Sequence, residues 1–237
     1  EEIHLWLADI DQPPKSLLEL AATLTADEQE RAARFRFPEH RARFIAGRGL
    51  LRELLGGYLN RPAAALRFSQ GSHGKPQLAG EEAAAGLHFN LAHSGHRALY
   101  AVARREVGVD LEQTDRPVDD AAIIHRICGA REWAAFQSVP PAQRQNAFFF
   151  FFFRKEAIAK ALGAGFASEW RTLEVCFQDG EPPHGRTRMR DPFGREWSLM
   201  NLLLEPGWIG ALAAAGAGWR YQFLFPIEPN LYPNRSD

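Results

Sequence analysis

The sequence predicts an α+β protein made of two similar halves, each combining helices with a small antiparallel sheet. Helical and strand-like stretches follow each other twice along the chain, which is the first observation behind this prediction. The second is size, because 237 residues that are 46% hydrophobic can bury the core of one large domain or of two small ones. No residue-level repeat links the halves, so their packing as a pseudodimer with the site between them is a hypothesis about architecture.

The first half is expected to begin with a strand, continue with two helices and end with short strands. Residues 3–8 alternate as in an edge or half-buried strand. Thr25 and Glu28 resemble a capping box, which predicts a helix to about residue 35. Pro38 fits the first turn of a longer helix that ends near residue 60. Short apolar runs bounded by glycine or polar residues predict strands at residues 66–69, 87–91 and 98–102, and a further strand at residues 107–111 follows in the second half.

After the strand at residues 107–111, the second half is expected to continue with helices and to end in a second small sheet. The pattern predicts helices at residues 119–127, 130–137 and 141–162, the last ended by Gly163. Strand signals then resume at residues 173–177, 196–204, 208–213 and 221–225, and a proline-rich tail follows Pro226 on the surface. We place the boundary so that residues 1–105 form an N-terminal half with elements that bind a cofactor and residues 106–237 form a C-terminal half with the acidic residues.

Charge and cysteine content exclude several classes of protein. The chain has 28 Lys and Arg against 29 Asp and Glu, so its formal net charge of −1 argues against a protein dominated by nucleic acid or an anionic membrane. The acidic N-terminus is expected to be neither a signal nor a transit peptide, and the longest apolar run is far below the ~20 residues of a membrane span. With only Cys128 and Cys176, we expect packed thiols and a cytoplasmic location.

Three carboxylates are candidates for a cation site. Asp110 and Glu112 stand two positions apart at the end of an apolar strand, so both project from the same face, although such a pair is more often a solvated strand edge. Glu156 follows six phenylalanines and shares a helical face with Lys160, for which an ordinary helix ion pair is the alternative. Together the three carboxylates would supply the hard oxygen ligands that Mg²⁺ prefers, and Mn²⁺ would satisfy them too.

Basic and small residues in the first half could hold phosphate. Gly74 and Lys75 lie on a glycine-proline turn, where backbone and side chain can both reach an anion. The strand that ends near His93 leaves backbone N–H groups and an imidazole for phosphate, although a lone loop histidine is more often structural or exposed. Seven arginines crowd residues 31–52, and most are expected on solvated helix faces, with those at helix starts able to reach a diphosphate.

Four motifs in this order resemble the 4′-phosphopantetheinyl transferases, in particular the long, monomeric type that activates surfactin synthetase. The motifs are Gly74-Lys75-Pro76, Phe89-Asn90-Leu91-Ala92-His93-Ser94, Gly108-Val109-Asp110-Leu111-Glu112, and Lys155-Glu156-Ala157 with Lys160. The resemblance spans roughly residues 25 to 165. It departs from the family at Ala92, where many members carry serine, and at Phe152, where many carry tryptophan.

The resemblance implies transfer of the phosphopantetheine arm of coenzyme A to a serine of an apo acyl or peptidyl carrier protein. Magnesium would be required and adenosine 3′,5′-bisphosphate released, by a monomer without nucleic-acid or membrane partners. Carried over by position, Asp110, Glu112 and Glu156 would bind the metal, Glu156 would also act as the base, and Lys160 would stabilise the departing phosphate. The coenzyme A contacts would be Arg31, Gly74, Lys75, Asn90, Leu91, Ala92, His93 and Lys160.

Two other functions compete with the transferase. A non-catalytic module that binds carrier protein or coenzyme A leaves Glu156 and Lys160 unexplained, and a Mg²⁺-dependent nucleotide phosphohydrolase lacks a separate residue to hold the attacking water. For the transferase we expect the carrier to dock across the cleft between the halves. Its landing surface would be the exposed part of the phenylalanine-rich helix at residues 148–153 and nearby basic side chains.

Overall fold

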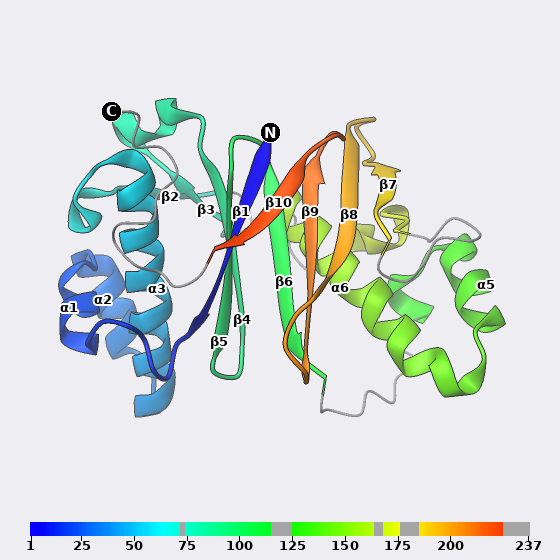
Figure 1. The fold of residues 1–237 in the computed structure, drawn as a ribbon, viewed down its shortest axis with the longest axis horizontal. Helices are drawn as coiled ribbons and strands as arrows, with labels where there is room; N and C mark the ends of the chain where they lie inside the picture. Colours follow the sequence, from blue (N-terminus) through cyan, green and yellow to red (C-terminus); the bar gives the residue numbers. More distant parts are fainter. Residues whose placement is uncertain (72–73, 115–124, 164–167, 176–184, 225–237) are drawn as a thin grey trace.

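The computed structural model describes residues 1–71, 74–114, 125–163, 168–175 and 185–224 (Figure 1). Its strands are β1 (Glu2–Asp9), β2 (Phe68–Gln70), β3 (Pro76–Leu78), β4 (His88–Ser94), β5 (Arg97–Ala103), β6 (Val107–Gln113), β7 (Thr187–Arg190), β8 (Glu196–Leu203), β9 (Trp208–Ala215) and β10 (Arg220–Leu224). The helices are α1 (Leu17–Ala22), α2 (Ala26–Ala33), α3 (Pro38–Leu59), α5 (Ala130–Ser138) and α6 (Arg144–Leu162), with short 3-10 turns at Ala63–Ala65, Gly80–Ala85, Pro141–Gln143 and Ser168–Thr172.

Two four-stranded sheets share one chain topology. The first sheet has the order β10-β1-β5-β4 and the second β6-β9-β8-β7, with β2 and β3 as a separate hairpin. In each sheet a strand leads into a long helix and then into a hairpin whose second strand pairs with the starting strand. The path β1-α3-β4-β5 in the first half therefore matches β6-α6-β8-β9 in the second. The prediction of two similar helix-plus-sheet halves is confirmed.

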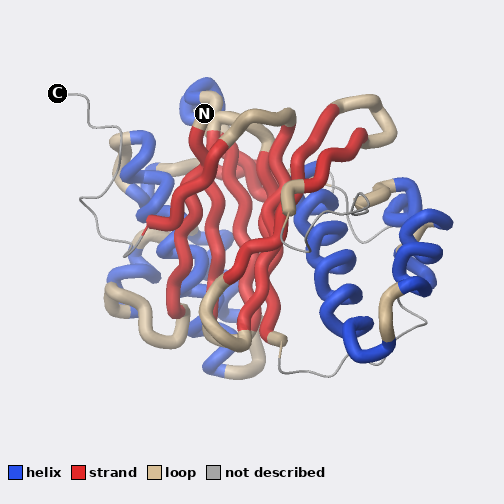
Figure 2. The backbone as a smooth tube through the Cα atoms, turned by 45° about the vertical axis from the view of Figure 1, so that its right-hand side comes forward, coloured by secondary structure: helices blue, strands red, loops and turns tan. Residues whose placement is uncertain are grey.

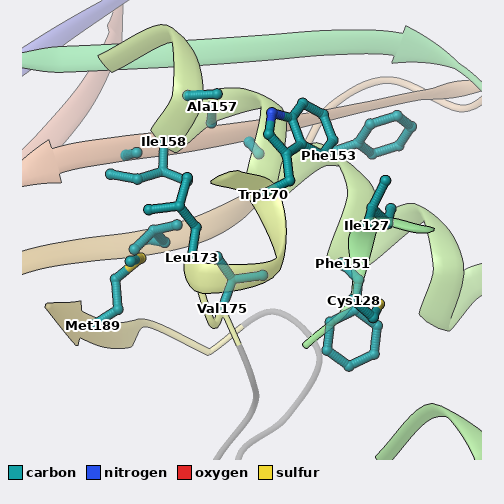
Figure 3. Close-up of a cluster of buried hydrophobic side chains, with 14 of the residues drawn as sticks. Ile127, Cys128, Phe151, Phe153, Ala157, Ile158, Trp170, Leu173, Val175 and Met189 are labelled. Carbon is teal, nitrogen blue, oxygen red and sulfur yellow. The ribbon is translucent and has the colours of Figure 1, made fainter. Parts of the chain in front are cut away.

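The two halves pack in four layers, in the order helix, sheet, sheet and helix (Figures 1 and 2). A hydrophobic cluster lies between each pair of neighbouring layers. Leu50 of α3 belongs to the cluster that covers the outer face of the first sheet. Side chains of both sheets, such as Leu5 and Val109, share the middle cluster. Figure 3 shows part of the third cluster, where Phe153 and Ala157 of α6 pack near Trp170. The sheets are thus joined by a common core.

Four of the six phenylalanines of α6 are buried, which limits the apolar surface expected on this helix. Phe148, Phe149, Phe151 and Phe153 are buried in the third cluster. Phe150 and Phe152 are partly buried against it. Six consecutive aromatic side chains surround a helix on all sides, and the second sheet, α5 and the Trp170 segment all contribute to their cover. Any exposed apolar surface of these six side chains therefore belongs to Phe150 and Phe152, and the landing surface on this helix stays a prediction.

Pairing between distant strands changes two predictions for the sheets. Residues 221–225 were expected in the second sheet, but β10 runs parallel to β1 and completes the first. This pairing makes β1 an interior strand, buried on both faces, and not an edge or half-buried strand. Residues 173–175 form no strand, and β7 takes the outer position in the second sheet. The predicted strand and helix residues 176–177 and 119–124, and the proline-rich tail after Pro226, lie outside the described residues.

Three further elements lack a strong sequence signal. Helix α1 has only six residues, β3 has three and β7 has four.

Cys128 is a buried free thiol, as expected for a packed thiol, and burial raises its pKa to about 11. Cys176 lies outside the described residues. Across the described parts of the chain, every helix is too short or too polar to cross a membrane.

Candidate functional site

The site forms where α6 crosses β6 at close range. Gly108 permits this approach, since a Cβ built on it would lie 2.1 Å from the Ala157 carbonyl oxygen and 2.4 Å from the Ala161 nitrogen. Side chains at alternate strand positions share a face, so Asp110 and Glu112 project toward the helix, as Gly108 does. The helix therefore brings its own polar residues against the two carboxylates.

Asp110 is the most buried charged group of the site. Its residue is 3% exposed, and Lys160 of α6 donates to its Oδ1 at 2.6 Å. The other carboxylate oxygen, Oδ2, is also buried but makes no hydrogen bond within the described part of the structure. A buried carboxylate oxygen without a donor is costly unless a cation or a ligand completes it. Asp110 thus has one oxygen available for a ligand.

Glu156 stands close enough to the strand carboxylates to be affected by their charges. Burial first, and then the charges of Asp110 and Glu112, raise the pKa of Glu156 to about 7, while the charge of Lys160 opposes the rise. Glu112 accepts a hydrogen bond of 2.8 Å from the Ser94 hydroxyl of β4. The predicted carboxylates and Lys160 are therefore brought together, and all four come from residues 106–162.

The donor set fits a hard divalent cation, although the ligands are not already gathered around one point. Carboxylate oxygens are what Mg²⁺ and Mn²⁺ prefer, and the unpartnered Asp110 Oδ2 is of this kind. Among the residues that the structure describes, no three His, Cys, Asp or Glu side chains form a ready metal cluster. Lys160 lies on Asp110, so a bound cation would compete with that ammonium for the carboxylate.

A small group of basic side chains, His93, Arg43 and Lys160, lies beside the carboxylates. The pKa of His93 is lowered by burial of its ring and by the positive charges of Lys160 and Arg43. Arg43 of α3 donates to both Asp11 carboxylate oxygens, at 2.7 and 2.8 Å. Three positive or titratable side chains thus converge from β4, α3 and α6, which is suitable for an anion with several charges. Sequence reasoning did not name Arg43 as a site residue, although Arg43 belongs to the arginine-rich stretch and to a segment, residues 43–48, that also resembles the family.

Lys75 and Asn90 are engaged with backbone atoms. The Lys75 ammonium donates to the carbonyl oxygens of Val107 at 3.1 Å and Ala161 at 2.8 Å. Burial lowers the pKa of Lys75 to about 8, against the opposing charge of Glu106. The Asn90 side chain is buried, and its Oδ1 accepts the N–H of Val109 at 2.9 Å. Both side chains of the first half therefore reach strand β6.

The other expected coenzyme A contacts are more scattered. Arg31 is exposed on α2, with its guanidinium 5.3 Å from the centre of the Phe44 ring. Gly74 lies in an exposed turn at φ +80°, a conformation that favours glycine. Leu91 packs against the first cluster and Ala92 is buried in the middle one. Their side chains serve the core, which leaves their backbone as the part that could reach a ligand.

Most arginines of residues 31–52 agree with the expected solvated faces, since Arg31, Arg34, Arg36 and Arg41 are exposed, but two near the end of the stretch differ. Arg52 is buried and donates to Glu28 at 2.7 Å and to the carbonyl oxygens of Ala63 and Leu66. Arg48 also pairs with Glu28. These two arginines hold α2 and α3 together, so they are not on a solvated face.

Phe152 packs against Trp170, with the two ring centres 5.7 Å apart. This is the position where many members of the resembled family carry tryptophan.

Comparisons with known proteins cover most of the chain. A family model described as the 4′-phosphopantetheinyl transferase superfamily matches residues 106–213, and one described as 4′-phosphopantetheinyl transferase, N-terminal, matches residues 12–105. The 4′-phosphopantetheinyl transferase HetI of Nostoc sp. is 42% identical over 94% of this chain and 92% of its own length. The 4′-phosphopantetheinyl transferase psf-1 of Bacillus pumilus is 32% identical over 70% of this chain and 69% of its own.

A solved structure shows a weaker likeness. The holo-[acyl-carrier-protein] synthase of Thermotoga maritima aligns with 46% of this chain and 62% of its own, at 20% identity and a TM-score of 0.28. A TM-score of this size carries no argument about shared architecture. The sequence matches, which extend over both halves, are the stronger result.

Proposed function

This chain belongs to the 4′-phosphopantetheinyl transferase superfamily, and from that premise we propose that it moves the 4′-phosphopantetheine group of coenzyme A to a serine of an apo acyl or peptidyl carrier protein. It is an enzyme of the phosphopantetheinyl transferase class. The observation that carries the finer proposal is the cluster of Asp110, Glu112, Glu156 and Lys160 between β6 and α6.

The proposed reaction is a phosphoryl transfer in which the protein binds and orients the reactants. The serine Oγ forms a bond to the β-phosphorus of coenzyme A, and the bond from that phosphorus to the bridging oxygen breaks. Adenosine 3′,5′-bisphosphate then leaves with the bridging oxygen. Such transfers need positioning and charge neutralisation more than covalent help from the protein.

Glu156 and Lys160 take the two proton and charge roles in this scheme. Glu156 accepts the serine proton, and a pKa of about 7 suits a base that works near neutral pH. Lys160, one helical turn later, donates toward the departing phosphate. Its present partner is Asp110, at 2.6 Å, so the ammonium already lies at the carboxylate cluster. Both roles rest on side chains of a single helix.

Asp110, Glu112 and Glu156 would hold Mg²⁺, and Mn²⁺ would suit the same oxygens. Bound there, the cation would neutralise charge on the diphosphate. The support is the chemistry of the donor set and the buried Asp110 Oδ2 that lacks a hydrogen bond in the described structure. His93, Lys160 and the exposed Arg31 and Gly74 remain proposed contacts to coenzyme A.

The proposal extends to the organisation of the enzyme. We assign coenzyme A contacts mainly to the N-terminal half, residues 1–105, and the metal ligands and base to the C-terminal half, residues 106–237. The contact of Ser94 with Glu112 supports a site at the junction of the halves. The enzyme is proposed to act as a cytoplasmic monomer.

Mass spectrometry of the carrier protein tests the function. The purified chain is incubated with coenzyme A, Mg²⁺ and a panel of apo carriers, and an increase matching one phosphopantetheine group on the carrier serine is the expected result. Release of adenosine bisphosphate with the carrier unmodified would point to hydrolysis instead. Binding of coenzyme A or carrier without either product, across the whole panel, would leave a binding module and overturn the transferase.

A further inference from the structure

Strand β6 lies at the edge of its sheet and has one row of backbone groups without a partner strand. On the other side it pairs with β9, where Ala215 N donates to Glu106 O and Thr114 N donates to Gly207 O. In an antiparallel pair these bonding positions recur at every second residue, so even-numbered residues of β6 bond to β9. The N–H and C=O groups of Val107 and Val109 therefore point to the outer edge, where β4 of the first sheet runs past (Figure 1).

Two side chains of the first half meet this outer edge. Lys75 donates to Val107 O and Asn90 accepts from Val109 N, so a donor meets the carbonyl and an acceptor meets the N–H. These are neighbouring positions on the free edge, and a pairing strand would bond to the same groups. The two side chains thus act in place of a partner strand.

Lys75 also binds α6, the helix that packs on the face of β6. Its ammonium donates to Ala161 O in the last turn of α6, one residue after Lys160. Gly163, which ends this helix, lies close to the aliphatic part of Lys75, because a Cβ built there would be 3.8 Å from it. One side chain from the β2-β3 hairpin therefore contacts both the strand with Asp110 and the helix with Glu156.

We propose that Lys75 and Asn90 are positioning residues, which cap the free edge of β6 and fix Asp110 and Glu112 against Glu156 and Lys160, and that their side chains do not bind coenzyme A. Only the expected effect on turnover rests on the proposed function. The Asn90 residue is 5% exposed and its Oδ1 is used by Val109 N. The Lys75 ammonium already has two acceptors, so a phosphate would have to displace backbone oxygens.

Removal of the Lys75 or the Asn90 side chain leaves a buried backbone group of β6, Val107 C=O or Val109 N–H, without this hydrogen bond, and no described strand pairs with that edge of the sheet. An unsatisfied buried N–H or C=O costs more than the net value of one hydrogen bond. Val109 is the residue before Asp110, so local loosening of the edge would move the first carboxylate directly. The expected effect is therefore on catalytic geometry and on local opening, and not on affinity for coenzyme A.

The test uses the full chain with Asn90→Leu, which keeps the size and removes the acceptor, Asn90→Asp, which keeps an acceptor oxygen, and Lys75→Met. Hydrogen exchange of the backbone amides at residues 107–113 should speed up about tenfold in Asn90→Leu and Lys75→Met. Calorimetric affinity for coenzyme A without metal or carrier should stay within about twofold of wild type, while kcat falls about tenfold or more with little change in KM for coenzyme A. Asn90→Asp should restore slow exchange at Val109.

Lys15→Met is the matched control for Lys75→Met, because Lys15 makes only a surface ion pair with Glu53 in the described structure. It should change neither exchange at residues 107–113 nor turnover. A tenfold loss of coenzyme A affinity in Lys75→Met or Asn90→Leu with normal exchange would overturn the proposal in favour of ligand roles. Faster exchange with unchanged kcat would also overturn it, since the caps would then be structural only. If wild type modifies no carrier, the proposed function fails, while the exchange and affinity measurements still decide whether the caps exist.

Discussion

Asp110 combines a cost to the fold with a use in the reaction. It is a buried carboxylate with Lys160 on one oxygen and no hydrogen bond on the other within the described structure, and Glu156 lies near enough to repel it. Burial of incompletely paired charge lowers stability. Functional residues are often retained in spite of such a cost. Removal of the Asp110 charge should therefore raise stability, whereas removal of a partner from an ordinary ion pair should not, so a stability measurement distinguishes the two.

Asp110→Asn should raise the stability of the metal-free protein and abolish most activity. The amide keeps an acceptor for Lys160, removes a buried charge and relieves repulsion with Glu156, whereas a cation loses one anionic ligand. We expect activity to fall at least about 100-fold, the scale for loss of one strong electrostatic contact at a transition state. Thermal unfolding with and without Mg²⁺ checks this, since Mg²⁺ should stabilise wild type more than the variant. Equal stabilisation of both proteins by Mg²⁺ would remove Asp110 from the ligand set.

The raised pKa of Glu156 predicts a pH-dependent stability of the metal-free protein. The folded pKa is about 7 against an ordinary 4.5, so the folded state holds this proton over a range in which the unfolded state has released it. The stabilisation is therefore complete below about 4.5 and is lost as the pH rises through about 7. Denaturant unfolding in a chelator at several pH values should show this decline. Glu156→Gln should flatten it, and an unchanged slope would mean that another group titrates.

At the scale of elements, the crossing of β6 by α6 depends on one missing side chain. Gly108 has helix backbone atoms where its Cβ would be, so the strand and helix touch main chain to main chain. This contact sets how far the carboxylates of the strand are from Glu156 and Lys160. Packing of the phenylalanine cluster then holds α6 against the second sheet.

Gly108→Ala should lower both stability and activity because the helix must move away. Overpacking of this kind costs about 1–3 kcal/mol. Gly47→Ala is the matched control, since a Cβ at Gly47 of α3 would have its nearest neighbour, the Tyr100 hydroxyl, at 3.9 Å, and alanine favours a helix. Chemical denaturation and turnover per folded molecule measure the two effects. Similar outcomes for both variants would show that the close approach is not limiting.

Local patterns predicted the elements well, and distant pairing limited the prediction. The helix from Pro38 ended within one residue of the expected position, because its start and end signals are local. The strand at residues 220–224 was predicted as a strand but assigned to the wrong sheet. Its short apolar pattern fits either sheet, and only the fold determines its partner.

For the candidate site too, local patterns predicted the residues and long-range contacts could not be predicted. Strand and helix periods placed Asp110 with Glu112 and Glu156 with Lys160 on common faces. That the two faces meet depends on the contact of Gly108 with α6, which no local pattern reveals. The hydrogen bonds of Lys75 and Asn90 to β6 likewise join residues far apart in the sequence. Residue types were therefore predictable, and their partners were not.

At the scale of the whole molecule, the two halves share a core and should unfold together. The middle cluster contains Leu5 and Leu99 of the first sheet and Val109 and Leu212 of the second, with Trp219 just before β10. A half cut from the chain would expose its side of this cluster. Cooperative unfolding follows from a shared core of this kind.

Trp219→Ala should weaken both halves at once. The side chain is 1% exposed, and truncation of a buried tryptophan costs about 3–5 kcal/mol. Hydrogen exchange should quicken in β5 as well as in β9, within a single unfolding transition. Phe193→Ala, at a residue that is 83% exposed, should have little effect. Two separate transitions in the wild-type protein would contradict the shared core.

The parallel pairing of β10 with β1 also determines when the molecule can mature during protein synthesis. Strand β1 is synthesised long before its partner β10, and Leu5 and Leu99 are synthesised before Leu212, which shares their cluster. Such late, non-local closure slows folding and keeps a β edge and apolar side chains accessible on the nascent chain. The first sheet is therefore completed only after residues 220–224 have emerged, and until then one edge of β1 has no partner strand.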